Sequence, residues 1–279
     1  VLPLTSLIAS RGCPYKCAYC ATTNLWGRRV RWRSPENFFN EIKYRIRTYN
    51  TRNFNFYDDC FTLNRKWVEE FCDRIIKDKV SINWSCISSI NLVDESLFKK
   101  IVEAGCIKIN LGVESGSERI ARLAKRTVKM EKIRRVFNYA KKYNISTAAY
   151  FMIGFPTETV QDIQETQRFI AELSPNWAYV NVLIPLPGTE MFRTCVDTGL
   201  LDKKMAWCGE LYRDLQTNYT GVINDSKFNE LVDETFALCF RNNKRLSNLF
   251  RRVPIRHYTA SPAKIFSDTK KLISWTRVR

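Results

Sequence analysis

No stretch of about 18 consecutive apolar residues occurs in this 279-residue sequence, so a membrane-spanning helix is not expected. The opening residues, VLPLTSLIAS, are too short for a signal peptide and lack its flanks. We therefore predict a cytoplasmic protein. An initiating methionine is also absent, because the sequence starts at Val1 and a first strand is expected almost at once. This start is compatible with a fragment or processed product from which an upstream domain is missing.

Internal repeats beyond a strand-helix unit and low-complexity segments are also absent. The chain is 45% hydrophobic and 13% aromatic, which is enough for one domain of barrel size and a smaller appendage. Its ten cysteines could indicate disulfides, but a chain of this length forms a sufficient core without them. Clustered thiols in a cytosolic protein more often bind metal or take part in chemistry, so we expect reduced cysteines.

Acidic residues are scarce near the C-terminus. The net charge of the chain is +17, from 45 basic and 28 acidic residues. Between residues 241 and 279, eleven basic residues are balanced by Asp268 alone, so this tail carries +10 of the excess. A basic surface of this kind attracts nucleic acid, anionic lipid, a phosphate-bearing substrate or a missing domain, and the sequence does not separate these partners.

Short apolar runs alternate with amphipathic stretches along most of the chain. Strands are predicted at residues 4–10, 53–59, 82–89, 106–115, 146–155 and 177–187, and helices at 34–49, 66–77, 94–105, 130–144, 160–173 and 188–199. The first of these helices begins with a capping Ser34 followed by Pro35. After an irregular stretch at 205–221, a long helix is expected at 226–250. Six strand-helix units imply a parallel sheet with right-handed crossovers, and functional loops after the strands.

The fourth predicted strand favours a barrel over an open sheet. Its odd positions from 107 to 113 are apolar, whereas its even positions from 108 to 114 are Lys, Asn, Gly and Glu. A strand covered by helices on both faces should be apolar throughout, so the polar face indicates a lined interior with Glu114 at its mouth. We predict an α/β fold, a partial (βα)6 TIM-like barrel over residues 1–190, with a basic, mainly helical extension over 191–279.

Three cysteines lie within eight residues in RGCPYKCAYC, at a C-x3-C-x2-C spacing, and no fourth follows nearby. Structural zinc normally takes four protein ligands, and a closed iron-sulfur cluster takes four thiolates. Cys13, Cys17 and Cys20 fit a 4Fe-4S cluster with one iron left free for a small chelating molecule. The spacing leaves a second interpretation open, in which zinc or a closed cluster recruits a distant thiol such as Cys60 or Cys208.

This segment resembles the cluster motif of radical S-adenosylmethionine (radical SAM) enzymes, including the aromatic Tyr19 before the last cysteine. The resemblance continues in order through FYDDCFT, AGCIKINLGVESGSE, FMIGFPTET and LIPLPGTEM, from Ser6 to Met191. Within the superfamily, the chain is most similar to the subgroup that usually carries an N-terminal cobalamin-binding domain. Its single histidine, His257, is interpreted as a structural or surface residue and not as a cobalt ligand. Cobalamin therefore rests on resemblance alone, and would need a domain not present in this chain.

The resemblance implies two cofactors and their chemistry. The open iron binds the amino and carboxylate groups of S-adenosylmethionine, and reductive cleavage yields a 5'-deoxyadenosyl radical that takes hydrogen from the substrate. The protein supplies orientation and excludes water. An electron donor such as a flavodoxin or ferredoxin is implied as a partner.

The resemblance also assigns residues to the cofactor. Tyr19 meets the adenine, or alternatively packs on the barrel rim. Asp58 or Asp59 meets the methionine ammonium, or caps the following helix. Glu114 accepts hydrogen bonds from the ribose hydroxyls. Five residues at two strand ends match positions that border the adenosine: Gly154, Phe155, Pro156, Pro185 and Leu186.

Several further residues have open assignments. Lys125 or Arg126 reaches the methionine carboxylate, unless it lies on a solvated helix face. Ser88 and Ser89 stand where family members often have an arginine for that carboxylate, which puts this contact in doubt. Cys60 follows the acidic pair and either reacts or merely packs. Three C-terminal cysteines match no compact cluster pattern: Cys195, Cys208 and Cys239.

Three functions remain open at this point. The first is a radical SAM enzyme that acts on an unreactive C–H bond of a small molecule, in C-methylation or a related rearrangement or cyclisation. The second is an RNA-modifying radical SAM enzyme, although the extra cysteine domain and RNA-binding barrel of related methylthiotransferases are not visible. The third is a non-catalytic iron-sulfur or zinc module that binds a partner. The motifs favour the first, and nucleic acid is not the expected partner.

Overall fold

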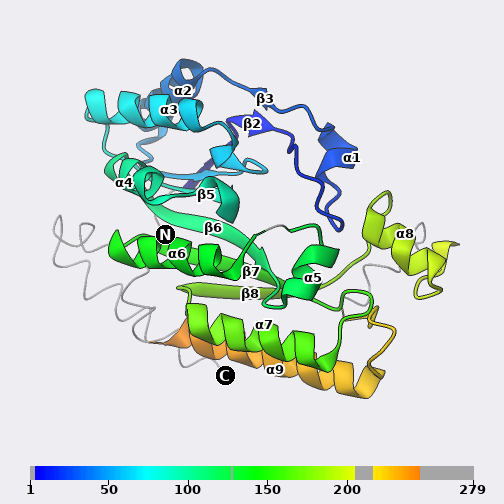
Figure 1. The fold of residues 1–279 in the computed structure, drawn as a ribbon. Helices are drawn as coiled ribbons and strands as arrows, with labels where there is room; N and C mark the ends of the chain where they lie inside the picture. The colour runs from blue at the N-terminus through cyan, green and yellow to red at the C-terminus, as the bar shows by residue number, and fades with distance from the viewer. Residues whose placement is uncertain (1–3, 127, 205–215, 246–279) are drawn as a thin grey trace.

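Six parallel strands and the helices between them make up most of the molecule (Figure 1). The structure is a computed structural model, and it describes residues 4–126, 128–204 and 216–245. The strands are β1 (Leu4–Leu7), β4 (Asn53–Phe56), β5 (Asn83–Ser89), β6 (Cys106–Glu114), β7 (Ser146–Ile153) and β8 (Trp177–Val182). They pair in the order β1-β4-β5-β6-β7-β8, every pair parallel, with β1 and β8 at the two edges.

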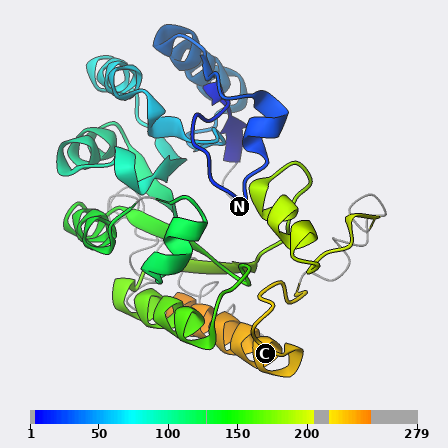
Figure 2. The same ribbon diagram turned by 45° about the vertical axis from the view of Figure 1, so that its right-hand side comes forward.

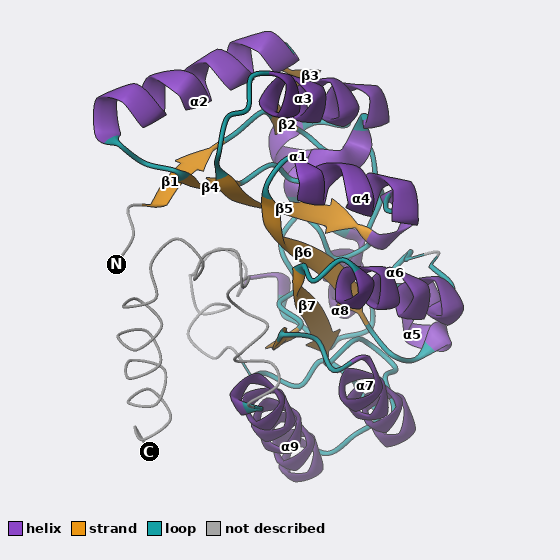
Figure 3. Cartoon of the chain, turned by 90° about the vertical axis from the view of Figure 1, so that its left-hand side faces the viewer, coloured by secondary structure: helices purple, strands orange, loops and turns teal. Residues whose placement is uncertain are grey.

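Helices cover one face of this curved sheet. They are α2 (Pro35–Tyr49), α3 (Arg65–Lys77), α4 (Glu95–Glu103), α6 (Met130–Lys142), α7 (Val160–Leu173) and α9 (Asp225–Lys244). The helix α8 (Glu190–Asp197) lies apart from them and contacts the cysteine segment instead. Figure 2 shows the helices as an outer arc around the strands, and Figure 3 shows them on one side of the sheet. The predicted α/β fold with a parallel six-stranded sheet is therefore confirmed, and the two edge strands leave it a partial barrel. None of the helices among the described residues is long and apolar enough to cross a membrane.

The helix starts follow from local capping chemistry. Ser34 accepts a hydrogen bond from the Asn37 amide and Pro35 opens α2, as predicted. At α3 the cap is Asn64, which accepts from the Trp67 amide. The suggestion that Asp58 or Asp59 caps this helix is therefore wrong.

Two short strands, two short helices and two turns of 3-10 helix were not predicted from the sequence, because each is too short to show a hydrophobic period. They are β2 (Ser10–Arg11), β3 (Arg31–Trp32), α1 (Thr22–Trp26), α5 (Glu118–Leu123), η1 (Phe61–Leu63) and η2 (Ile90–Leu92). β2 and β3 pair antiparallel, away from the main sheet. The predicted first strand is thus split, since Leu7 ends β1 and Ser10 starts β2.

The C-terminal region continues the core as far as the structure describes it. On α9, Phe228, Leu231 and Val232 are buried in the same hydrophobic cluster as residues of the sheet. A second, smaller cluster lies apart from this core among the described residues after 190, and it contains Phe192, Cys195, Leu201 and Tyr219. The predicted domain boundary at residue 190 stays a prediction. The predicted helix 226–250 agrees with α9 up to Lys244. The rest of the basic tail and most of the irregular stretch lie outside the described residues.

A cluster of aromatic rings stabilises the sheet beside the functional end of β4. Phe56 stacks on Trp84 of β5 with ring centroids 5.1 Å apart, and it also meets Phe38 of α2 at 5.0 Å. Rings packed this way add about 0.5–1.5 kcal/mol per pair to the stabilisation from burial. The chain that leaves β4 at Phe56 therefore starts from a rigid base.

Asp58, two residues after β4, fastens the segment that leaves β1. Its buried carboxylate accepts hydrogen bonds from the amides of Ala9 and Ser10, at 3.3 and 2.5 Å, and from the Ser10 hydroxyl at 2.6 Å. These bonds fix the backbone immediately before the cysteine segment.

We predict that Asp58→Asn lowers the free energy of unfolding by about 1.5–3 kcal/mol, because a buried charged acceptor of several hydrogen bonds is lost. Urea unfolding measures the change. Asp73→Asn serves as the control, since Asp73 is 62% exposed and pairs with Lys100 on the surface, where a pair contributes about 1 kcal/mol or less. Equal losses for the two variants would contradict the role given to Asp58.

Candidate functional site

The three clustered cysteines line one cavity of about 150 Å³. The cavity lies where the cysteine segment meets the carboxyl ends of β4, β5 and β6. Its lining residues are Cys13, Tyr15, Cys17, Tyr19, Cys20, Thr22, Asp59, Cys60, Ile87, Ser88, Ser89, Gly112, Glu114 and Arg126. Most of the polar residues expected from the sequence therefore come together here.

The cysteine segment is held in place by backbone hydrogen bonds to distant elements. The Ala18 amide donates to the Ala124 carbonyl after α5, at 3.1 Å, and the Met191 amide of α8 donates to the Ala18 carbonyl at 2.9 Å. Ala18 is buried in a small apolar cluster with Phe155 and Met191. The loop thus presents its thiols from a fixed backbone.

The thiols have the environment of a site for a cationic metal centre. Burial raises the pKa of Cys13, and the negative charges of Cys17, Cys20 and Asp59 add to the rise, although a backbone hydrogen bond at Tyr15 lowers it. The thiolate form of Cys13 is therefore disfavoured in the chain alone, and a cationic centre bound to the thiols would favour it.

The arrangement fits an iron-sulfur cluster better than a single ion. In the described part of the chain, no three His, Cys, Asp or Glu side chains converge on a position for one metal ion. Mononuclear zinc needs its ligands about 2.0–2.3 Å from one centre. A 4Fe-4S cluster takes each thiolate on a different iron, so three thiols around a shared cavity suit it.

Glu114 reaches the cavity through an irregularity in β6. The register between β6 and β7 shifts between Gly112 and Glu114, and Glu114 has a φ of +70°. Such a conformation costs a non-glycine residue about 1–3 kcal/mol and is typical of functional sites. Its carboxyl group accepts a hydrogen bond from Tyr19; burial raises the pKa of Glu114, whereas Arg126 and Tyr19 lower it. The sequence prediction that the polar face of this strand turns inward agrees with this position.

Gly112 leaves the room that this carboxylate needs. A Cβ atom at position 112 would collide with the Glu114 carboxylate and lie 3.3 Å from the Arg126 guanidinium. The sequence places Gly112 only on the polar face of its strand. Its place in the GVES motif is explained by this close approach.

Arg126 and Lys125 have opposite environments. Arg126 donates to the Gly112 carbonyl at 2.7 Å and to the Cys17 sulfur at 3.7 Å. Its Nε atom is buried and has no partner within the described structure. Lys125 is 48% exposed and forms an ion pair with Glu190 at 2.5 Å. Of the two, Arg126 is the one that the structure brings to the cavity.

The acidic pair after β4 is divided in the same way. Asp59 lines the cavity and accepts from the Gly12 amide at 2.9 Å. Asp58 does not line it, because its oxygens are engaged by Ala9 and Ser10. A ligand contact remains open to Asp59 only.

The five residues assigned to the adenosine border lie behind the cavity rather than on it. Gly154, Phe155, Pro156, Pro185 and Leu186 are not among the lining residues. Phe155 is fully buried and meets Tyr19 edge to face at 6.2 Å. Of the five, Phe155 is thus the residue that packs against the cysteine segment.

The remaining cavity residues include some that the sequence did not single out. Tyr15, Thr22 and Ile87 were missed, although Tyr15 lies between two of the cysteines and position alone could have suggested it. Ser88 and Ser89 are present where an arginine was expected, and the Ser88 hydroxyl is 2.5 Å from that of Thr62.

The other cysteines differ from the triplet. Cys60 lines the cavity but is buried, and burial raises its pKa to about 12. Cys195 and Cys239 lie in two separate hydrophobic clusters, so these two do not form a second metal site together. Cys208 lies outside the described residues.

Comparison with known families and sequences identifies related proteins. The model of the family described as "Radical SAM superfamily" matches residues 7–170. An uncharacterized methyltransferase of Pyrococcus horikoshii is 30% identical over 200 residues, which cover 72% of this chain and 44% of that protein. An anaerobic magnesium-protoporphyrin IX monomethyl ester cyclase of Rubrivivax gelatinosus is 27% identical, over 70% of this chain and 36% of that protein. The chain thus spans less than half the length of these relatives.

Solved structures show the same fold at low sequence identity. The radical S-adenosylmethionine methyltransferase TsrM from Kitasatospora setae, determined with cobalamin and a [4Fe-4S] cluster, matches with a TM-score of 0.65 at 17% identity. That match covers 70% of this chain and 39% of TsrM. Coproporphyrinogen III oxidase from Escherichia coli matches with a TM-score of 0.60 at 16% identity, over 86% of this chain and 53% of the oxidase.

A buried carboxylate under the site predicts a pH-dependent stability. Glu158 accepts from the amides of Gly154 and Phe155, and burial raises its pKa from 4.5 to about 8. The folded state therefore holds a proton that the unfolded chain releases, so stability should fall as pH rises from about 4.5 to about 8. Glu158→Gln should remove this fall, which reaches at most about 1.4 kcal/mol per pH unit.

Urea unfolding at pH 5, 6.5 and 8 tests this expectation. Glu118→Gln is the control, because Glu118 is a 61% exposed carboxylate on α5. It should keep the wild-type profile. Parallel profiles for the wild type and Glu158→Gln would show that Glu158 does not titrate in this range.

Proposed function

This chain belongs to the radical SAM superfamily, and on that premise we propose that it forms the core of an enzyme acting on an unreactive C–H bond. The proposed reaction is C-methylation or a related rearrangement or cyclisation of a small molecule. Relatives named as a methyltransferase and a cyclase support this range of reactions. The observation that carries the proposal is the cavity shared by three clustered thiols, a buried carboxylate and a half-buried arginine.

Cys13, Cys17 and Cys20 would hold a 4Fe-4S cluster, and S-adenosylmethionine would occupy the adjoining part of the cavity. Once bound and reduced, these two cofactors supply a 5'-deoxyadenosyl radical that removes hydrogen from the substrate. The three thiols come from one loop whose backbone is hydrogen-bonded at Ala18 to residues 124 and 191. An electron donor such as a flavodoxin or ferredoxin belongs to the proposal as a partner.

The polar residues of the cavity would bind the functional groups of S-adenosylmethionine. Arg126, through its unpartnered Nε, suits the methionine carboxylate, and Asp59 suits the ammonium group. Glu114 suits the ribose hydroxyls, because its conformation and its neighbour Gly112 hold the carboxylate in the cavity. Tyr19, which donates to Glu114, would border the adenosine.

Cobalamin is proposed as a candidate second cofactor on the basis of the relatives. TsrM and the enzyme OxsB are both described with cobalamin bound. Their likeness to this chain is one of fold, at 17% and 15% identity. A cobalamin-binding domain would have to lie outside these 279 residues.

The two other functions receive less support. A zinc module needs ligands that converge on one ion, and the part of the chain with a described structure offers no such set. An RNA-modifying enzyme would rely on the basic tail, most of which lies outside the described residues. The radical SAM enzyme is therefore the function that we retain.

The first test separates an open cluster from one closed by a fourth thiol. The chain is reconstituted anaerobically with iron and sulfide, reduced and given S-adenosylmethionine; bound iron and 5'-deoxyadenosine are then measured. Cys17→Ala should lose both, whereas Cys60→Ala should keep both, because the Cys60 thiol is buried and protonated. If Cys60→Ala lost its iron as completely as Cys17→Ala, the cluster would be a closed one with four thiolates.

The second test uses neighbouring cations with different environments. Arg126→Gln should weaken S-adenosylmethionine binding by roughly 10- to 100-fold, the effect of losing one charged hydrogen-bond donor. Lys125→Gln should leave it unchanged, because Lys125 lies outside the cavity. Equilibrium dialysis against the reconstituted chain measures affinity, and iron content shows whether each variant keeps its cluster. Unchanged affinity in Arg126→Gln with an intact cluster would contradict the assignment.

A further inference from the structure

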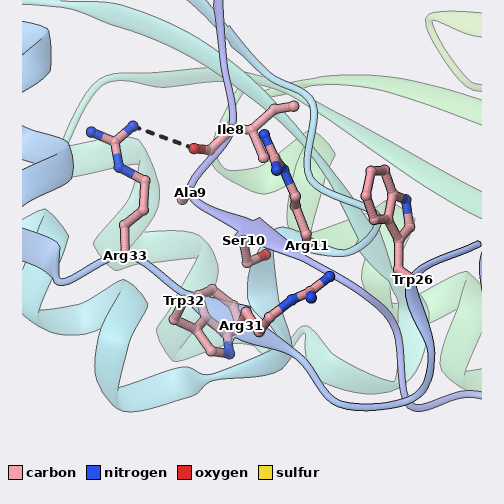
Figure 4. Close-up of a pocket in the computed structure, with 8 residues that line it drawn as sticks. All are labelled: Ile8, Ala9, Ser10, Arg11, Trp26, Arg31, Trp32 and Arg33. Atoms are coloured by element: carbon pink, nitrogen blue, oxygen red, sulfur yellow. Dashed lines mark hydrogen bonds between the residues drawn. The ribbon is translucent and has the colours of Figure 1, made fainter.

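A second cavity lies beside the cysteine segment, between β2, β3 and the end of α1 (Figure 4). Its volume is about 520 Å³, within the range of about 300–1,000 Å³ that is typical of small-molecule sites. It is lined by residues 8–10, by three arginines and by two tryptophans. The arginines are Arg11, Arg31 and Arg33, and the tryptophans are Trp26 and Trp32. It shares no lining residue with the cysteine cavity.

The charge of this cavity is one-sided. Arg11 and Arg31 face each other as register partners in the β2-β3 pair. Like charges directly opposite each other on paired strands are destabilising. Neither arginine has an ion pair within the described chain, and no acidic residue precedes Glu36 in the sequence. Both arginines are exposed residues of the cavity wall, and the described chain offers neither of them a carboxylate partner.

The third arginine of the cavity, Arg33, is neutralised by a carboxylate. It pairs with Glu41 at 2.5 Å, and it donates hydrogen bonds to the Asn37 side-chain oxygen at 2.8 Å and to the Ile8 carbonyl at 3.4 Å. In Figure 4 this side chain points toward Ile8, away from Arg11 and Trp26. Arg33 is thus a structural residue, whereas Arg11 and Arg31 retain their donors.

The walls of the cavity are fixed before any ligand arrives. Trp32 packs against Trp67 with ring centroids 5.4 Å apart, and the Trp67 indole donates to the Arg33 carbonyl at 2.7 Å. On the other side, Asp58 holds the backbone of Ala9 and Ser10. A site built in this way loses little freedom when a ligand binds.

Trp26 adds a flat surface to the charged pair. The Arg11 guanidinium lies over its ring, 5.6 Å from the centroid, and the indole is 43% exposed. Planar groups stack well on tryptophan and on guanidinium. Two arginines also match the oxygens of a phosphate or carboxylate group.

We propose that this cavity is an anion site, which takes a phosphate or carboxylate group between Arg11 and Arg31 and a planar ring of the same ligand against Trp26. The site is independent of the radical chemistry proposed above, because the two cavities have no residue in common. A ligand in this site would contact Arg11. The next residue, Gly12, donates its amide hydrogen bond to Asp59 in the cysteine cavity.

The test uses adenosine monophosphate as a probe with a ring and a phosphate, and inorganic phosphate and adenosine as probes with one feature each. Binding to the 279-residue chain is followed by tryptophan fluorescence and by the melting temperature. Adenosine monophosphate should bind most tightly and raise the melting temperature. If inorganic phosphate bound as tightly as adenosine monophosphate, the contact of a ring with Trp26 would be refuted. If neither adenosine monophosphate nor inorganic phosphate bound, the whole proposal would be overturned.

Variants locate the binding. Arg31→Gln should weaken the binding of adenosine monophosphate by roughly 10- to 100-fold. Without ligand, it should raise the melting temperature, because the repulsion with Arg11 is removed. Arg28→Gln removes the same charge from an exposed residue outside the cavity and should change neither result. Equal weakening in both variants would mean that the anion responds only to the general positive charge.

A final variant separates this proposal from the proposed enzyme function. Cys17→Ala should bind adenosine monophosphate as tightly as the parent chain, although it produces no 5'-deoxyadenosine. Loss of anion binding in Cys17→Ala would show that the two cavities are one site and would overturn the proposal of a separate one.

Discussion

The acidic pair at the end of β4 is the constraint on which both cavities depend. Asp58 receives the amides of Ala9 and Ser10, and Asp59 receives the amide of Gly12. Two neighbouring carboxylates thus bind three amides within residues 9–12, the stretch that leads from β1 to the cysteine segment. One side of this segment leads into the thiols and the other forms a wall of the arginine cavity. A change in the pair would therefore alter two sites through one piece of backbone.

The parallel sheet explains why such distant residues meet. All six strands run in the same direction, so their carboxyl ends lie along one edge, where Asp59, Ser89 and Glu114 follow three neighbouring strands. The elements are ordered by their crossover helices, and each helix buries its apolar face against the sheet. Precision at the edge comes from departures from regularity: the shifted register before Glu114, its positive φ, and the glycine that makes room for its carboxylate.

The sequence predicted the long, periodic parts of the fold and the residues that belong to contiguous motifs. It found the six parallel strands, their helices and the cysteine triplet because each has a period or a spacing that short-range physics imposes. It did not predict β2, β3 or α1, which are only two to five residues long. It could not divide the roles within the pairs Asp58 and Asp59 or Lys125 and Arg126, since adjacent residues have the same motif but point to different surroundings. Burial and hydrogen bonding make that distinction, and both depend on tertiary structure.

The distribution of charge connects the two cavities to the rest of the chain. Three thiols and two carboxylates line one cavity with the half-buried Arg126, so deprotonation of the thiols would create a negative excess that a bound cationic centre would balance. A few residues away along the chain, Arg11 and Arg31 have the opposite imbalance. Folding brings neither excess to its natural counterpart, because the rigid segment held by Asp58 and Asp59 keeps them on separate surfaces. Because Arg11 and Arg31 are exposed, water screens their charge and both guanidinium groups stay available to an anion. On the other side of the same fixed segment, the three thiols are available to a cationic centre.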